Sequence, residues 1–285
     1  MRLGYNTNGL AFHAPMDALR LLAETGFESV ALTIDHGLLN PLASDWRAEA
    51  ERYAAWLQEH HMRSVVETGA RFLLDARQKH EPTLLTGSTE GRQQRVEFTK
   101  RAIDIAQILG SDCVSLWSGV LREELSDEEA LERLCEGLGP IVEYAEAAGV
   151  VLGFEPEPGM FVATVGEFER LCQWISSDAL RLTMDIGHLY CQGEVPIADY
   201  IRRWGDRIVN VHIEDMRAGE HVHLMFGEGE IWFPPIIEAL TEVGYAGGLH
   251  VELSRHSHEG VSAVRRAYDF LRPLMVPDRE PPATS

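Results

Sequence analysis

The stretch Val209–Arg217 reads VNVHIEDMR and indicates how the chain folds. A run of apolar, mostly β-branched residues carries one histidine, His212, and then breaks into charged residues and a long loop. Such a run is typical of a strand that is buried in a parallel sheet and presents a polar side chain at its carboxyl end. Three other runs end in the same way on a carboxylate, at Glu155, Asp185 and Glu252. We therefore expect these four side chains to lie together.

Eight short apolar runs occur along the chain, and a helical pattern follows each. The expected strands are Leu3–Thr7, Ser29–Ile34, Ser64–Glu67, Cys113–Trp117, Val150–Glu155, Arg181–Asp185, Ile208–Ile213 and Gly248–Leu253. The expected helices are Met16–Thr25, Asp45–His61, Arg92–Leu109, Asp127–Ala148, Val165–Ile175, Ile197–Trp204, Phe233–Val243 and Val261–Leu271. Several of these helices end on a glycine, such as Gly26 or Gly110, which supplies a left-handed turn. Ser126 followed by Glu129 predicts a capping box.

Eight alternating strand and helix units predict a parallel sheet, and eight is the number that closes into a barrel. A doubly wound sheet is the alternative, but Asn6–Gly9 does not provide the glycine-rich phosphate turn that it needs after its first strand. The expected fold class is therefore α/β, a (β/α)8 TIM barrel. Residues 1–275 are expected to form this single domain, with Phe72–Gly91 as a loop over its mouth. The Pro-rich residues 276–285 are expected to be a disordered tail.

The composition limits the partners of the chain. Its 285 residues carry 25 Lys and Arg against 45 Asp and Glu, a net charge of -20 that would repel nucleic acid. The N-terminal residues lack the apolar core of a signal peptide, and no run of roughly 18 apolar residues predicts a membrane span. The four cysteines are far apart, which argues against a disulfide framework or a zinc ribbon. We expect a cytoplasmic protein that binds neither nucleic acid nor membranes.

The strand ends of such a barrel converge on one site. Because side chains alternate along a strand, Ile208, Asn210 and His212 are expected to share the inner face of theirs. A single carboxylate at a strand end would more simply be a helix cap, and His212 alone a hydrogen-bonded core histidine. Three carboxylates and one imidazole on consecutive strands instead predict one divalent ion, for which Mn2+, Mg2+, Co2+ and Zn2+ are suitable.

Five motifs resemble those of a known family. They are FEPEP at 154–158, DIGH at 185–188, VHIED at 211–215, GEGEI at 227–231 and VEL at 251–253. In this order they resemble the motifs of the xylose-isomerase-like TIM-barrel superfamily, over nearly the whole chain. That superfamily includes sugar and sugar-phosphate isomerases and epimerases, inosose-processing enzymes and the endonuclease IV branch.

The resemblance implies a function and roles for four residues. Glu155, Asp185, His212 and Glu252 match the metal ligands, with Mn2+ as the expected ion, and Glu155 and Glu252 match the pair that exchanges the substrate proton. The implied activity is that of a divalent-metal-dependent isomerase or epimerase of a sugar, a sugar derivative or a cyclitol. It would act by proton transfer through a metal-stabilised enediolate, since a metal ion that holds adjacent carbonyl and hydroxyl oxygens acidifies the C–H between them.

The resemblance also implies substrate contacts. His188 and Arg217 match residues that bind substrate oxygens, although a hydrogen bond from His188 to Asp185 and a solvated Arg217 are the simpler interpretations. The epimerases carry a further glutamate several residues beyond Glu155, and this chain does not. Glu157 is a substitute for it or caps the following loop.

Other substrate-binding candidates stand at the remaining strand ends. Glu67 ends the third expected strand and is placed to bond a substrate hydroxyl, and Trp117 ends the fourth and is placed to stack on a sugar ring. Tyr5 and His36 end the first two strands and are candidates for further contacts.

His221 and His223 precede the GEGEI motif, in a loop that the family folds over the pocket. A hydrogen-bonding role toward substrate is expected for them, with a second metal site as the less favoured alternative.

Two other activities are known in this superfamily. Endonuclease IV enzymes carry histidines where Glu67 and Trp117 stand, so DNA repair is not expected. A metal-dependent dehydratase or lyase that acts on a keto-polyol such as an inosose is the alternative, and a non-catalytic sugar-binding barrel is disfavoured by the full set of ligands. The expected partner is a small sugar-like substrate, and the sequence is compatible with a monomer or a homo-oligomer.

Overall fold

The computed structural model describes residues 1–275, so the tail expected at 276–285 lies outside the described residues. Eight parallel strands form a closed barrel in the order β1-β10-β7-β6-β5-β4-β3-β2. The strands are β1 (Arg2–Asn6), β2 (Ser29–Thr33), β3 (Arg63–Glu67), β4 (Val114–Leu116), β5 (Leu152–Phe154), β6 (Leu180–Asp185), β7 (Ile208–Ile213) and β10 (Gly248–Val251). The predicted (β/α)8 barrel is confirmed.

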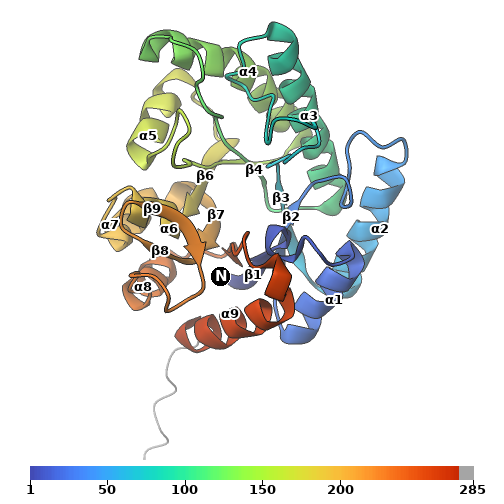
Figure 1. The fold of residues 1–285 in the computed structure, drawn as a ribbon, viewed down its shortest axis with the longest axis vertical. Coiled ribbons are helices and arrows are strands. Elements are labelled where there is room, and N and C mark those ends of the chain that lie inside the picture. Colours follow the sequence, from blue (N-terminus) through green and yellow to red (C-terminus); the bar gives the residue numbers. More distant parts are fainter. Residues whose placement is uncertain (276–285) are drawn as a thin grey trace, which may run out of the picture.

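Helices surround the barrel, and the first and last of the main helices lie side by side (Figure 1). The α-helices are α1 (Pro15–Thr25), α2 (Trp46–Glu59), α3 (Thr89–Leu109), α4 (Asp127–Ala148), α5 (Val165–Trp174), α6 (Ile186–Cys191), α7 (Ile197–Trp204), α8 (Pro234–Glu242) and α9 (Gly260–Met275). Short 3-10 turns occur at η1 (Thr7–Leu10), η2 (Gly205–Arg207) and η3 (Ser257–Glu259). The sequence did not predict α6 or the hairpin of β8 (Asp215–Arg217) and β9 (Glu220–Leu224).

The predicted helix ends are confirmed where local chemistry defines them. The backbone N–H of Ser126 donates to the Glu129 carboxylate at 2.9 Å, and the Ser126 hydroxyl accepts the Glu129 N–H at 3.3 Å. This reciprocal capping box begins α4. Gly26 and Gly110 adopt φ values of 107° and 63° at the ends of α1 and α3, which directs the chain into the next strand.

Two hydrophobic layers support the barrel. A small cluster of Ala31, Val65 and Cys113, with Val151 and Val209 packed against it, fills part of the interior. The large cluster between strands and helices includes Ile208, so the expectation that Ile208 faces inward was wrong. The register between β6 and β7 shifts at Leu182/Thr183, and this irregularity interrupts the alternation on which that expectation depended.

A buried polar layer lies beside this small cluster. His250 has no exposed surface, and its ring nitrogens lie 2.8 Å from Asn210 Oδ1 and 2.9 Å from Ser29 Oγ. A Cβ atom on Gly4 or Gly248 would overlap the His250 ring, which explains glycine at both positions. Burial lowers the pKa of His250 to about 3, so the ring stays neutral.

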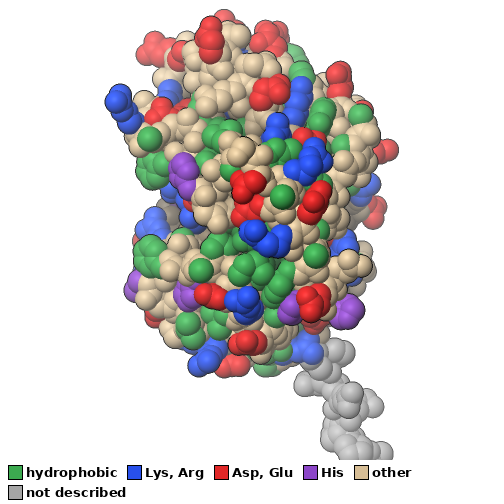
Figure 2. All heavy atoms as spheres, turned by 90° about the vertical axis from the view of Figure 1, so that its right-hand side faces the viewer, with side chains coloured by type: hydrophobic (Ala, Val, Ile, Leu, Met, Phe, Trp, Pro, Cys, Tyr) green, Lys and Arg blue, Asp and Glu red, His purple; other side chains and the backbone are tan. Residues whose placement is uncertain are grey.

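The surface carries mixed charge. On the face shown in Figure 2, Lys and Arg side chains are interspersed with acidic and hydrophobic ones. Within residues 1–275, no helix is long and apolar enough to cross a membrane.

Candidate metal centre

The four predicted ligands lie on four adjacent strands of the barrel. Asp185 ends β6 and His212 lies in β7, directly opposite each other in the strand pairing. Glu155 follows β5 and Glu252 follows β10, and all four therefore stand at the carboxyl end of the barrel. One ligand atom from each residue lies within 4.8 Å of the other three. The fold thus brings together the residues that the four strand ends suggested.

The geometry and chemistry of this group fit a divalent ion. His212 Nδ1 lies 2.9 Å from Glu155 Oε1, 2.8 Å from Glu252 Oε2 and 3.8 Å from Asp185 Oδ2. Asp185 Oδ2 is buried and has no hydrogen-bond partner among the described residues. A buried carboxylate oxygen without a partner is costly, and a cation would offset that cost. Three carboxylates and one imidazole form a donor set that suits Mn2+ and similar ions.

Opposing effects control the protonation of the group. Burial raises the pKa of Glu155 to about 8. Burial also opposes a charge on His212, but the carboxylates around it outweigh burial and raise its pKa well above the usual range. For Glu252 burial favours the neutral form, yet the contact with His212 dominates and lowers its pKa. A divalent ion would compete with the His212 proton for the same nitrogen.

Glu67 makes contacts within the protein that the sequence did not predict. Its Oε1 atom lies 2.9 Å from His212 Nε2 and 3.2 Å from Asn210 Nδ2, so this oxygen accepts hydrogen bonds within the protein. A carboxylate that accepts the Nε2–H of a histidine leaves Nδ1 free to coordinate a metal. Glu67 therefore orients His212, although it also borders the cavity.

A cavity of about 650 Å³ opens at this group, and Glu155, His212 and Glu252 line it. Of the predicted substrate contacts, Glu67, Trp117, Glu157 and His223 line it. The Arg95 guanidinium lies 4.4 Å from the centre of the Trp117 ring and covers one face of it. The expected mouth loop contributes Lys79 and His80 to the wall.

Two asparagines in the cavity wall were missed. Asn6 and Asn8 line the cavity, and Asn8 Nδ2 donates to Glu252 Oε1 at 2.6 Å. Tyr5, the candidate from this strand, instead packs edge-on against Phe27 in the core. The other candidate, His36, is part of the exposed surface. The sequence did carry a signal for the two asparagines, because Asn6 and Asn8 are polar residues with alternate spacing at the end of a strand.

Arg217 does not reach the cavity, contrary to what the resemblance implied. It lies opposite Glu220 at the turn of the β8–β9 hairpin, and its guanidinium donates to the Glu228 carbonyl oxygen at 3.2 Å. About half of its side chain is exposed.

Glu214, three residues before Arg217, is fully buried. Its burial is the main cause that raises its pKa well above the usual range, and the nearby Asp185 carboxylate raises the pKa further.

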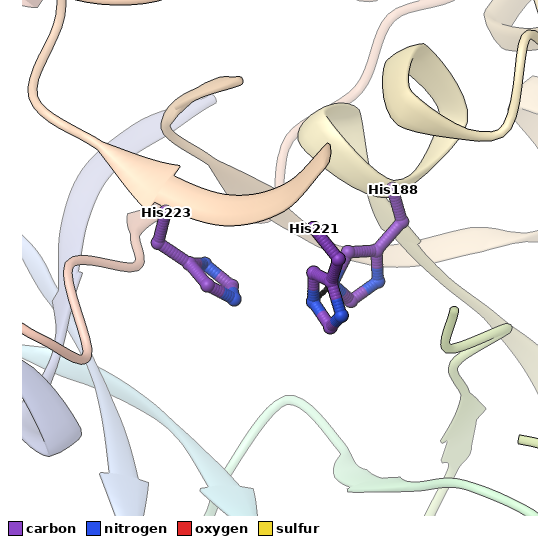
Figure 3. Close-up of side chains that lie close together, drawn as sticks. All are labelled: His188, His221 and His223. Carbon is purple, nitrogen blue, oxygen red and sulfur yellow. Dashed lines mark hydrogen bonds between the residues drawn. The ribbon is translucent and has the colours of Figure 1, made fainter. Parts of the chain in front are cut away.

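Three histidines form a second cluster beside the first. His188 comes from α6, and its backbone N–H donates to Asp185 Oδ1 at 2.8 Å. His221 and His223 come from β9, so the expected loop is a strand that directs both rings to one side (Figure 3). Glu157 lies 3.9 Å from His188 and 3.7 Å from His221. Burial lowers the pKa of His188 to about 4, so its ring is neutral.

The chain is similar in sequence to known proteins. The family model described as xylose isomerase-like TIM barrel matches residues 19–274. L-ribulose-5-phosphate 3-epimerase UlaE of Escherichia coli (strain SE11) is 25% identical over 262 residues, which cover 91% of this chain and 89% of that protein.

Solved structures share the fold. The IOLI protein with a bound zinc atom has a TM-score of 0.76 at 18% identity, over 96% of this chain and 98% of that one. The 3-keto-D-glucoside 4-epimerase YcjR from E. coli has a TM-score of 0.76 at 18% identity, over 96% of this chain and 99% of that one. An L-ribulose 3-epimerase has a TM-score of 0.74 at 20% identity, over 96% of this chain and 94% of that one.

Proposed function

Since the chain belongs to the xylose isomerase-like TIM-barrel family, we propose that it is a divalent-metal-dependent isomerase or epimerase of a sugar, a sugar derivative or a cyclitol. The observation that carries this proposal is the convergence of Glu155, Asp185, His212 and Glu252 at one point, where all but Asp185 also line the cavity. Relatives that are named as epimerases favour this reaction over dehydration of a keto-polyol.

The four residues would hold the ion, and Mn2+ is our first choice because three of the donors are carboxylates. When bound, the ion would supply Lewis acidity to neighbouring carbonyl and hydroxyl oxygens of the substrate. Two neighbours keep the ligands in place. Glu67 accepts from His212 Nε2, and Asn8 holds the Glu252 oxygen that does not face His212.

Glu155 and Glu252 are the proposed acid and base. They follow β5 and β10, which two other strands separate, so their carboxylates approach His212 Nδ1 from different sides. Both border the cavity. A substrate carbon between two such carboxylates could lose a proton to one and receive a proton from the other, which inverts the centre. A cavity of about 650 Å³ is within the range of small-molecule sites and has room for a monosaccharide.

Solvent isotope exchange tests this function. The Mn2+-loaded protein is incubated in D2O with a panel of keto-sugars and inososes, and products are analysed by NMR and mass spectrometry. We expect deuterium at the carbon next to the carbonyl, formation of an epimer or isomer, and loss of both in Glu252→Gln. Glu238→Gln, on the exposed face of α8, is the matched control. A conjugated enone without an epimer would establish the dehydratase instead, and a product formed without solvent exchange would exclude proton transfer.

A further inference from the structure

A continuous chain of hydrogen bonds runs through the barrel interior behind the proposed metal ligand His212. Ser29 Oγ lies 2.9 Å from His250 Nε2, and His250 Nδ1 lies 2.8 Å from Asn210 Oδ1. Asn210 Nδ2 lies 3.2 Å from Glu67 Oε1, and this oxygen lies 2.9 Å from His212 Nε2. Ser29 begins β2 and Glu67 ends β3, so the chain of hydrogen bonds extends toward the carboxyl end of the barrel. All five side chains are buried, and Ser29, Asn210 and His250 have no exposed surface.

The carboxylate at the end of this chain gives every hydrogen bond in it the same direction. A carboxylate oxygen only accepts, so the amide nitrogen of Asn210 donates to Glu67 and the amide oxygen faces His250. That oxygen also only accepts, so His250 Nδ1 carries the proton of the neutral ring and Nε2 accepts from the Ser29 hydroxyl. The other acceptor near this hydroxyl, the Arg63 carbonyl oxygen, is farther away at 3.4 Å. Each donor therefore points toward Glu67.

Glu67 Oε1 receives two donors, the Asn210 amide and the Nε2–H of His212, whose nitrogen atoms lie 3.1 Å apart. The Asn210 amide supports the carboxylate in the position where it accepts from His212. Without the donor of His250, the Asn210 oxygen would be buried without a partner. Nothing would then hold the amide plane in the orientation that serves Glu67, so the support of His212 depends on His250.

The neighbouring strands leave room for the His250 ring. Gly4 lies directly opposite His250 in the pairing of β1 with β10, and Gly248 lies two residues before His250 on the same face of β10. A Cβ atom at either glycine would overlap the ring. Glycine inside a strand costs conformational entropy and provides no side chain to pack. Two strand positions are therefore kept free of side chains so that one polar ring fits, which a smaller apolar residue at position 250 would not require.

We propose, building on the metal site of the proposed function, that Asn210, His250 and Ser29 are positioning residues for the metal ligand His212. They act through Glu67, because Asn210 holds the carboxylate, His250 holds the Asn210 amide, and Ser29 fixes the tautomer of His250. His212 Nε2 thereby keeps its proton on Glu67, and Nδ1 stays directed at the place where the ion would bind. None of the three positioning residues lines the cavity, so their substitution acts through His212 and not through a contact with substrate.

The Mn2+ affinity of two variants tests the role of His250. His250→Leu fills the space but removes both hydrogen bonds, whereas His250→Asn keeps an N–H donor close to the position of Nδ1. We expect the Mn2+ dissociation constant, measured by electron paramagnetic resonance, to rise by at least about 5-fold in the leucine variant. In the asparagine variant it should remain within about 2-fold of the wild-type value. A loss of packing alone would not be rescued by asparagine, which is smaller than leucine.

A matched pair of serine variants tests the far end of the chain of hydrogen bonds. Ser29→Ala removes the donor to His250 and should raise the Mn2+ dissociation constant, but less than His250→Leu does. Ser115→Ala is the control, because it deletes an equally buried hydroxyl that bonds to Thr183 and has no contact with the chain of hydrogen bonds. The control should keep the wild-type affinity. This pair also makes the comparison if His250→Leu does not fold, and equal affinities in the two variants would then overturn the proposal.

The proton between His212 and Glu67 gives a measurement that requires no metal ion. In protein labelled with 15N at histidine, the His212 Nε2–H should give a low-field NMR signal that exchanges slowly with water and is absent in His212→Asn. His250→Leu should shift this signal upfield and accelerate its exchange, whereas Ser115→Ala should not. Wild-type Mn2+ affinity with an unchanged signal in folded His250→Leu would overturn the proposal. If the wild-type protein bound no Mn2+, the proposed function would fail, and the NMR signal alone would decide the role of His250.

Discussion

His212 uses its two ring nitrogens on opposite sides, because Nε2 lies 2.9 Å from Glu67 Oε1 while Nδ1 lies 2.9 Å from Glu155 Oε1. Glu67 ends β3 and His212 lies in β7, so the contact crosses the barrel interior. The contact with Glu67 determines that Nδ1 of His212 faces the carboxylates. It also determines the orientation of the His212 ring as a proposed metal ligand.

Glu67→Gln should weaken metal binding. The amide has the same shape but accepts the Nε2–H of His212 less strongly, so the ring is less basic and less well oriented. We expect the Mn2+ dissociation constant to rise by about 10- to 100-fold, as for other partners of metal-binding histidines. Titration followed by Mn2+ electron paramagnetic resonance measures this. Unchanged Mn2+ affinity with a raised KM would instead restore the predicted contact between Glu67 and a substrate hydroxyl.

Asn8→Asp should impair turnover more than Asn8→Ala. Asn8 Nδ2 donates to Glu252 Oε1 at 2.6 Å, and a carboxylate at that position would repel Glu252 where the alanine would only release it. We expect kcat to fall about 10-fold for the alanine variant and further for the aspartate variant. Steady-state kinetics at saturating Mn2+ would show this order, and equal activity of the two variants would contradict the proposed role of Asn8.

Metal binding should release a proton and weaken at low pH. The carboxylates around His212 raise its pKa well above the usual range despite burial, so the ring is protonated near neutral pH when no cation competes. Coordination through Nδ1 requires that the proton leave. Calorimetric titration in two buffers with different ionisation enthalpies should therefore give different apparent enthalpies. Identical enthalpies would show that no net proton is released.

The fold should lose stability as the pH falls, through His250. Burial lowers its pKa to about 3 in the folded chain, whereas the unfolded chain binds the proton below about pH 6.5. The contribution of the neutral His250 ring to the free energy of unfolding is therefore complete above about pH 6.5 and is lost as the pH falls toward 3. At about pH 5.5 the free energy of unfolding is lower by about 1.4 kcal/mol. Urea unfolding of the metal-free protein at several pH values measures it. His250→Gln should lack this part of the acid sensitivity, and the exposed control His60→Ala should retain it.

Arg217→Ala should leave substrate binding nearly unchanged. The side chain is half exposed and contacts only its own hairpin and the following loop among the described contacts. Exposed pairs of this kind contribute less than about 1 kcal/mol, so KM and stability should change little. A large increase in KM would show that the hairpin moves over the substrate and brings Arg217 to it.

The strand ends and several helix ends could be predicted from the sequence because their signals are local. Each apolar run that ends on a carboxylate or histidine marks the carboxyl end of a strand, and a parallel barrel brings all such ends to one edge. For this reason the sequence predicted that four residues lie together: Glu155, Asp185, His212 and Glu252. Glycines and a capping box similarly defined several helix ends.

Other features depend on contacts that no local pattern encodes. Glu67 and His212 are 145 positions apart and meet only across the closed barrel. Arg217 was misplaced because the hairpin after β7 could not be distinguished from a loop, although the alternate spacing of His221 and His223 was a strand signal. Ile208 was misplaced because a register irregularity breaks the period of two.

The central claim is that Glu155, Asp185, His212 and Glu252 hold one divalent ion. The most direct measurement is a crystal structure of the Mn2+-soaked protein with anomalous scattering recorded at the manganese edge. We predict one manganese peak at about 2.2 Å from His212 Nδ1 and from an oxygen of each of the three carboxylates. A map without a peak there, with His212 still hydrogen-bonded to Glu155 and Glu252, would contradict it.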